Sequence, residues 1–202
     1  MRCASRKYAD LRRRLAELRK HLLFFLPSPP QSKTTYSAQE CDLTRCYILL
    51  AHAEIENFCE DLALERPEGR SSCFTLPVAF RRCCEKSWPY YVAKEKRSWS
   101  EVNIPSTVVV ESALNSYFSV VYENHGVKRQ NLEKLLYPLG VLESKLNATW
   151  LANMSSFGAN RGTWADKSIK AANAPDPQTE ASKVDQLLQG LLQLDRVVSR
   201  LR

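Results

Sequence analysis

The sequence predicts an all-α protein built as one helical bundle. Apolar residues recur every three or four positions over long segments, which is the spacing of an amphipathic helix. We find no internal repeat, no glycine-rich phosphate loop and no alternation of strands with helices. A chain of 202 residues is long enough to bury one hydrophobic core, so we expect a single domain over residues 1–202.

Individual helices follow from the apolar spacing and from the residues that start and stop it. The pattern predicts helices at residues 5–25, about 37–64, 107–126, about 129–137, about 147–157 and 176–202. The first lies in a strongly basic N-terminal segment, residues 1–30, that ends in a proline-rich stretch. Gly126 closes the third, and the last begins with Asp176 as N-cap and Pro177 in its first turn.

The composition is that of a folded, basic protein. Hydrophobic residues make up 44% of the chain and charged residues 25%, which excludes an intrinsically disordered protein. Lys and Arg number 29 against 22 Asp and Glu, and this excess makes a polyanion such as RNA a reasonable partner. A basic surface without any nucleic-acid role is an equal alternative.

Residues 66–106 interrupt the helical pattern with prolines and a glycine, and predict an irregular, loop-rich insertion. The insertion mixes basic and aromatic side chains, a composition that contacts single-stranded RNA by charge and by stacking. The candidate RNA-binding residues are Arg81, Arg82, Lys86, Trp88, Lys94, Lys96 and Arg97. The aromatic side chains could equally anchor the loop to the bundle.

The cysteines and the apolar runs indicate a cytoplasmic protein. Seven cysteines are an odd number, and no secretory signal precedes them, so we expect free thiols. The apolar run "HLLFFL" is too short to span a membrane. Cys73, Cys83 and Cys84 lack partners at metal-ligand spacing, so neither a zinc site nor a cofactor is expected.

One polar stretch, "SSFGANRGTWADKS" at residues 155–168, places Arg161 five positions before Asp166. In the second predicted helix, Glu54 lies on the border of the apolar face. Glu54 could line a cleft and face a cation, for which Arg161 is the candidate. The more ordinary alternative is a solvated carboxylate that pairs with a basic neighbour.

The histidines offer few groups for proton transfer. His52 and His21 are expected to face solvent, and Glu56 to point away from the apolar face as His52 does. His125 ends a helix, where an interaction with the helix dipole is its ordinary explanation.

A long helix reading "LLAHAEIENFCEDLA", followed by "FGANRGTWADKS", resembles the HEPN superfamily over roughly residues 37–200. The resemblance is in particular to its stand-alone bacterial members, of either the MAE_28990/MAE_18760-like or the RiboL-PSP-like type. This resemblance implies a HEPN-like helical bundle that is commonly a homodimer. It also implies RNA as a partner, because many members are metal-independent endoribonucleases of toxin-antitoxin and antiviral defence systems. An antitoxin or another defence-system protein is then a further partner.

The family signature is an Arg, four to six intervening residues, and a His. By position, Arg161 matches the arginine, which stabilises the negative transition state, and Asp166 stands where the histidine belongs. Histidine can both take up and release a proton at neutral pH, whereas an ordinary aspartate, with a pKa of about 3.9, can only accept one. This difference places catalysis in doubt.

Three hypotheses follow for the function. The first is an endoribonuclease of divergent or degenerate chemistry, with Arg161, Asp166 and Glu54 as its catalytic residues. The second is a catalytically inactive HEPN-like module that binds RNA or a protein partner. The third is an unrelated helical interaction module in which Arg161 and Asp166 pair with each other and close a turn.

Overall fold

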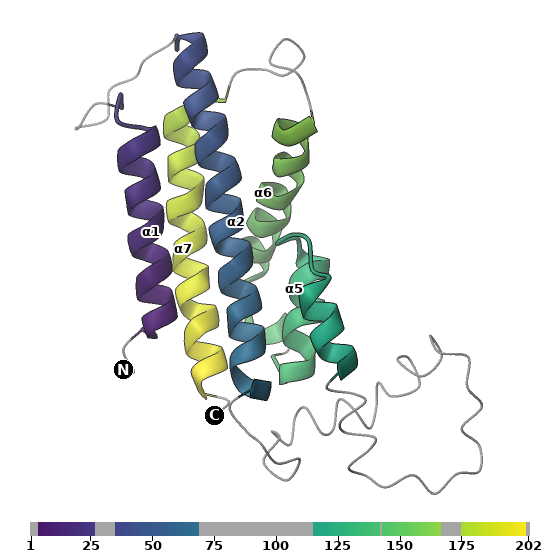
Figure 1. The fold of residues 1–202 in the computed structure, drawn as a ribbon. Coiled ribbons are helices and arrows are strands. Elements are labelled where there is room, and N and C mark those ends of the chain that lie inside the picture. Colours follow the sequence, from purple (N-terminus) through teal and green to yellow (C-terminus); the bar gives the residue numbers. More distant parts are fainter. Residues whose placement is uncertain (1–3, 27–34, 69–114, 142, 167–174, 201–202) are drawn as a thin grey trace, which may run out of the picture.

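The computed structural model describes residues 4–26, 35–68, 115–141, 143–166 and 175–200. Within these ranges every regular element is a helix, which confirms the all-α prediction (Figure 1). None of the helices in these ranges combines the length and the apolarity that crossing a membrane requires.

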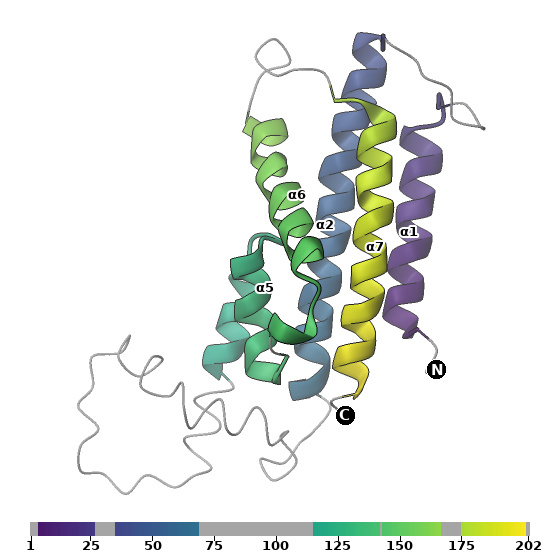
Figure 2. The same ribbon diagram turned by 180° about the vertical axis from the view of Figure 1, so that it is seen from behind.

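The helix α2 packs against each of the other labelled α-helices. The helices α1 (Arg6–Leu22) and α7 (Pro177–Arg200) both contact α2 (Ala38–Glu68), and they also contact each other. On another side, α2 contacts α5 (Arg129–Leu136) and α6 (Ala148–Asp166), as Figures 1 and 2 show from opposite directions. A further helical stretch at 115–122 precedes α5.

Side-chain caps fix where two of these helices begin. The Ser5 hydroxyl accepts a hydrogen bond from the Tyr8 N–H at 3.1 Å and starts α1. The Asp176 carboxylate accepts one from the Thr179 N–H at 2.8 Å, and Pro177 opens α7, so the predicted start of the last helix is confirmed.

Helix α6 extends to Asp166, well beyond its predicted end near residue 157. The indole ring of Trp164 packs against the hydrophobic core, and the Arg45 guanidinium lies 5.6 Å from the centre of that ring. Such tertiary contacts outweigh the low helix propensity of the glycines in this segment. The hypothesis that residues 161–166 form a turn is therefore wrong.

The core is one continuous cluster to which the described helices contribute. Its fully buried members include Ile48 and Ile55 of α2, Leu135 of α5, Met154 of α6 and Leu191 of α7. Burial of each such side chain contributes roughly 1.5–3 kcal/mol, so the packing of α2 against its neighbours holds the fold together.

A close approach between α6 and α7 depends on one glycine. The Trp150 indole N–H donates to the carbonyl oxygen of Leu187 at 3.1 Å, which holds the ring flat against α7. A Cβ atom at Gly190 would lie 2.1 Å from Cδ1 of this ring. Only a residue without a side chain therefore fits at this contact.

We predict that Gly190→Ala lowers the free energy of unfolding by about 1–3 kcal/mol, because the buried ring has to move. This cost outweighs the roughly 1 kcal/mol by which alanine favours a helix over glycine. Urea denaturation measures the change, with the exposed neighbour Gln189→Ala as control, expected within about 0.5 kcal/mol of wild type. An increase in stability for Gly190→Ala would contradict the close packing of α6 on α7.

Candidate functional site

Arg161 lies on α6 and reaches toward α2. Its Nη1 is 3.9 Å from Oε2 of Glu56, and the Arg161 side chain is 45% exposed whereas that of Glu56 is 14% exposed. The ion pair is therefore long and open to solvent on the arginine side. A guanidinium held in this way can still bind an anion that approaches from solution.

Glu56 lies at the centre of the polar groups around Arg161. Burial raises the pKa of its carboxyl group, and the charge of Glu60 adds to this effect. Arg161, the backbone N–H of Gly126 and the charge of His125 act in the opposite direction on the pKa. Cationic and polar groups from two other segments of the chain thus converge on one carboxylate.

His52 lies behind Glu56 and is 1% exposed. Its Nδ1 is 3.4 Å from Oε2 of Glu56, and its ring stacks on Phe157 of α6 with the ring centres 5.7 Å apart. Burial, and then the charge of Arg161, lower the pKa of His52 to about 4. The imidazole is therefore neutral at physiological pH, and neither ring nitrogen has a hydrogen-bond partner in the described part of the chain.

An amide network positions the segment that carries His125. The Asn124 side chain donates from Nδ2 to the Glu60 carboxylate at 2.8 Å and to the Gly126 carbonyl at 3.1 Å. Asn131 donates in turn to Oδ1 of Asn124 at 3.0 Å. Because Glu60 is on α2, these bonds hold the segment against that helix and leave the His125 side chain exposed. We call Arg161, Glu56, His52 and His125 the Arg161 cluster.

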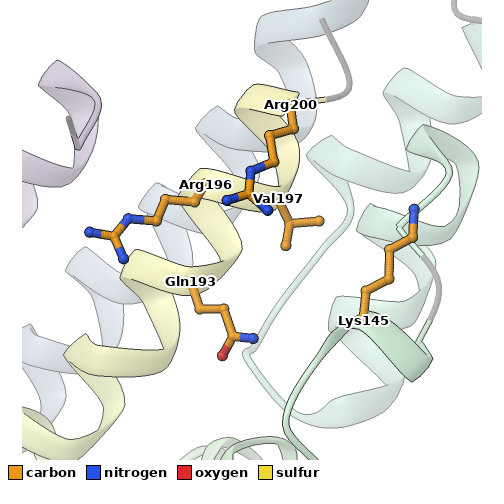
Figure 3. A pocket seen from close by; sticks show the side chains of 5 residues that line it. All are labelled: Lys145, Gln193, Arg196, Val197 and Arg200. Atoms are coloured by element: carbon orange, nitrogen blue, oxygen red, sulfur yellow. The ribbon is translucent and has the colours of Figure 1, made fainter. Parts of the chain in front are cut away.

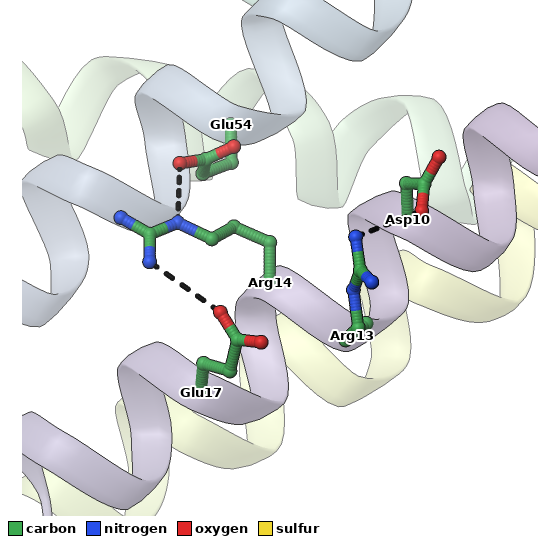
Figure 4. Close-up of polar contacts among 5 residues, drawn as sticks. All are labelled: Asp10, Arg13, Arg14, Glu17 and Glu54. Carbon is green, nitrogen blue, oxygen red and sulfur yellow. Dashed lines mark hydrogen bonds and ion pairs between the residues drawn. The ribbon is translucent and has the colours of Figure 1, made fainter.

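The predicted pairing of Glu54 with Arg161 is wrong. Oε1 of Glu54 accepts a hydrogen bond from Nε of Arg14 at 3.0 Å, and Arg14 also lies 3.5 Å from Glu17 (Figure 4). Two helical positions turn a side chain by about 200°, so Glu54 and Glu56 point to nearly opposite sides of α2. Glu54 therefore joins α1 to α2, which is the ordinary alternative that the sequence allowed.

The prediction that His52 and Glu56 face away from the core is also wrong. Both were expected to point away from the core, but α6 covers this side of α2 and buries them. A signal was present in the sequence, because His52, Glu56 and Glu60 recur every four residues as a polar stripe on one side of the helix. His21, in contrast, is exposed as predicted.

Asp166 is the last residue of α6, and its side chain lies outside the described part of the structure. The catalytic role expected of Asp166 therefore stays a prediction.

The basic and aromatic residues of the predicted insertion also lie outside the described residues, apart from the helical end of α2 up to Glu68. Arg81, Arg82, Lys86, Trp88, Lys94, Lys96 and Arg97 remain predicted RNA contacts. Cys73, Cys83 and Cys84 lie in the same undescribed range. The described cysteines Cys41, Cys46 and Cys59 are free thiols.

The Arg161 cluster offers two kinds of chemistry. Arg161 supplies a cation for a phosphate or a developing oxyanion, and the exposed imidazole of His125 can carry a proton. Among the side chains that the structure describes, no group of three His, Cys, Asp or Glu comes together as a metal site would require.

Comparison with known proteins gives one match. The model of the family described as RiboL-PSP-HEPN matches residues 9–165, a range that includes every member of the Arg161 cluster. Neither a curated protein nor a solved structure gives a significant match to the chain.

We predict that the free energy of unfolding decreases as the pH is lowered, because His52 is buried and neutral in the folded state. Its pKa of about 4 in the folded state lies below 6.5, the value for an unfolded chain, so the unfolded state takes up a proton first as the pH falls. Stability is then lost between about pH 6.5 and pH 4, by on the order of 3 kcal/mol. The raised pKa of Glu56 gives a slope of opposite sign, and both wild type and variant retain it.

Urea denaturation across this pH range, on wild type and on His52→Leu, isolates the contribution of His52. The variant should lose the drop in stability, whereas His21→Leu, at an exposed histidine, should keep it. An identical pH dependence in wild type and His52→Leu would contradict a buried, neutral imidazole.

Proposed function

Because this chain belongs to the RiboL-PSP-HEPN family, we propose that it acts on RNA as an endoribonuclease whose catalytic groups are Arg161 and His125. One observation carries this proposal: a half-exposed arginine lies 3.9 Å from the carboxylate of Glu56, and the segment with the exposed His125 is held on the same helix, α2, by the hydrogen bond from Asn124 to Glu60. An arginine and a histidine are the two residue types that the family motif combines. In this chain the histidine comes from a different segment, since Asp166 occupies the motif position.

Arg161 is suited to bind the phosphate at which the chain is cut. Its guanidinium has several N–H donors in one plane, which match phosphate oxygens well. The distance of 3.9 Å to Glu56 leaves these donors available without the loss of a short ion pair. As negative charge grows on the phosphate oxygens in the transition state, the same donors bind more strongly and lower the barrier.

His125 is suited to move the protons. In the proposed reaction the 2′-hydroxyl oxygen of RNA attacks the adjacent phosphorus, and its proton passes to a base. The bond from phosphorus to the 5′ oxygen breaks, and that oxygen receives a proton as it leaves. An imidazole can serve both steps near neutral pH. His52 is buried and neutral, so it supports Glu56 and Phe157 from behind and does not contact substrate.

The second hypothesis, an inactive RNA-binding or protein-interaction module, retains one supporting observation. The motif histidine is replaced by Asp166, and a carboxylate would repel the phosphate. In that case Arg161 binds RNA without subsequent cleavage.

We predict that wild type cleaves single-stranded RNA and leaves 2′,3′-cyclic phosphate ends. His125→Gln should lower the rate by about 10²–10⁴-fold through loss of acid–base assistance. Arg161→Gln should lower it by about 10²–10³-fold through loss of charge stabilisation. Gel separation of labelled fragments gives the rates, mass spectrometry identifies the ends, and His21→Gln is the matched control.

The variants also separate the two hypotheses. Rates unchanged by His125→Gln would remove His125 from the mechanism. RNA binding that is weakened by Arg161→Gln, with no cleavage by wild type, would favour the inactive module. In that case Asp166→His should introduce cleavage if the rest of the site is intact.

We extend the proposal to a role in bacterial toxin-antitoxin or antiviral defence, with an antitoxin or defence-system protein as partner. The family resemblance supports this role, and it supports a homodimer as well. A second copy could dock on the side of α2 where Cys46, Leu50 and Ala53 are exposed, with Leu50 43% exposed.

If the protein is a toxin-like ribonuclease, its expression in a bacterial host should arrest growth. Arg161→Gln at the same expression level should relieve the arrest, because the variant keeps the fold but lacks the guanidinium that the proposed cleavage requires. Growth curves with matched immunoblots measure the effect, and His21→Gln should remain toxic. Equal toxicity of wild type and Arg161→Gln would contradict the defence proposal.

A further inference from the structure

A cavity of about 510 Å³ lies away from the Arg161 cluster, between the last turns of α7 and the short helix η3 (Glu143–Lys145). It is lined by Lys145, Gln193, Arg196, Val197 and Arg200 (Figure 3). In Figure 3, Lys145 faces α7 from the opposite wall, and Val197 projects into the space between them. A volume of this size is typical of sites for small organic ligands.

The charge of the cavity has one sign. Lys145 and Arg200 contribute two cations to its lining, whereas the guanidinium of Arg196 turns away from it, toward the side of α1 (Figure 3). No described carboxylate lines the cavity, and none of the described acidic side chains forms an ion pair with Lys145 or Arg200. Arginines elsewhere differ, since Arg19 pairs with Asp185 at 2.8 Å.

Helix electrostatics explain only part of this arrangement. Cations in the last turn of a helix interact favourably with its dipole, which accounts for Arg200 on α7. Lys145 comes from a separate element and gains nothing from that dipole. Its approach to the same cavity brings like charges together, and such an arrangement is favourable when an anion lies between them.

We propose that this cavity binds the phosphate group of a nucleotide. Arg200 and Lys145 contact the phosphate from two walls, because a planar guanidinium and a compact ammonium group both bind phosphate oxygens. The amide of Gln193 can donate and accept hydrogen bonds, and Val197 offers an apolar surface to a ribose or a base. The nucleotide is either part of an RNA strand or free in solution.

The site is separate from the proposed catalytic centre. Lys145 precedes the start of α6 at Ala148, and a rise of about 1.5 Å per residue places Arg161 about 20 Å further along that helix. One phosphate cannot contact both sites. The RNA alternative therefore describes a second contact on the same strand and rests on the proposed function, whereas binding of a free nucleotide does not.

The experiment compares two double variants of the full chain that each remove two exposed positive charges. Lys145→Gln/Arg200→Gln changes the cavity, and Arg13→Gln/Lys20→Gln is the control on α1. Fluorescence anisotropy with a short labelled single-stranded RNA is measured at several salt concentrations, and calorimetry with adenosine monophosphate at one. Arg161→Gln is measured in parallel, and thermal melting confirms that each variant is folded.

If RNA occupies the cavity, the cavity variant should reduce the slope of log affinity against log salt by about 0.7, since Lys145 and Arg200 share one phosphate and each neutralised phosphate on a single strand contributes about 0.7. The control should leave the slope close to that of wild type. If a free nucleotide occupies it, adenosine monophosphate should bind wild type and lose at least tenfold in affinity in the cavity variant alone. This second result would stand even if wild type fails to bind RNA, which would overturn only the proposed function.

The cavity proposal is overturned by either of two results. One is equal loss of RNA affinity in the cavity variant and the control, without nucleotide binding, since general surface charge would then explain the effect. The other is unchanged RNA affinity in the cavity variant together with no binding of adenosine monophosphate to wild type.

Discussion

The rest of the structure depends on the enclosure of α2 by its neighbours. The helices α1, α5, α6 and α7 all contact it, so side chains at most angles around its axis face another helix. Apolar residues fill most of these contacts, and the polar residues among them have to find partners because an unpaired buried polar group is costly. On one side Glu54 pairs with Arg14 in a contact that remains open to solvent. On the other this requirement brings Glu56 to Arg161 and to the N–H of Gly126, and so assembles the Arg161 cluster.

The sequence predicts well those features that depend on residues within one helical turn, such as an N-cap. It fails where the packing of several helices decides the structure. The start of α7 follows from Asp176 and Pro177 alone, because a cap acts within one turn. The orientation of α2 does not follow, because a helix that is buried on several sides has no single apolar face to align. The end of α6 was also missed, since the contact of Trp164 with Arg45 joins residues far apart in the chain. Arg161 follows from its motif, and the spacing of His52 and Glu56 marks a polar stripe, but their burial depends on tertiary contacts with α6.

The electrostatics of the cluster link anion binding to protonation. Burial raises the pKa of Glu56, and the positive charge of Arg161 keeps that increase in check. On the proposed function, a phosphate at Arg161 would offset this charge and favour the protonated carboxyl group. His52 cannot supply that charge, because protonating it inside the core is itself unfavourable. Proton uptake at Glu56 would therefore accompany RNA binding, and it would reduce the repulsion between the carboxylate and the phosphate.

On the proposed function, the hydrogen bonds of Asn124 with Glu60 and Asn131 have a consequence for when the protein becomes active. They hold the segment that carries His125 against α2, and the ribosome adds Arg161 of α6 only 36 positions after His125. A nascent chain that ends after α5 contains the histidine but still lacks the guanidinium. A cell that makes a ribonuclease of this kind would thus be protected during synthesis, since cleavage has to wait until α6 has emerged and docked.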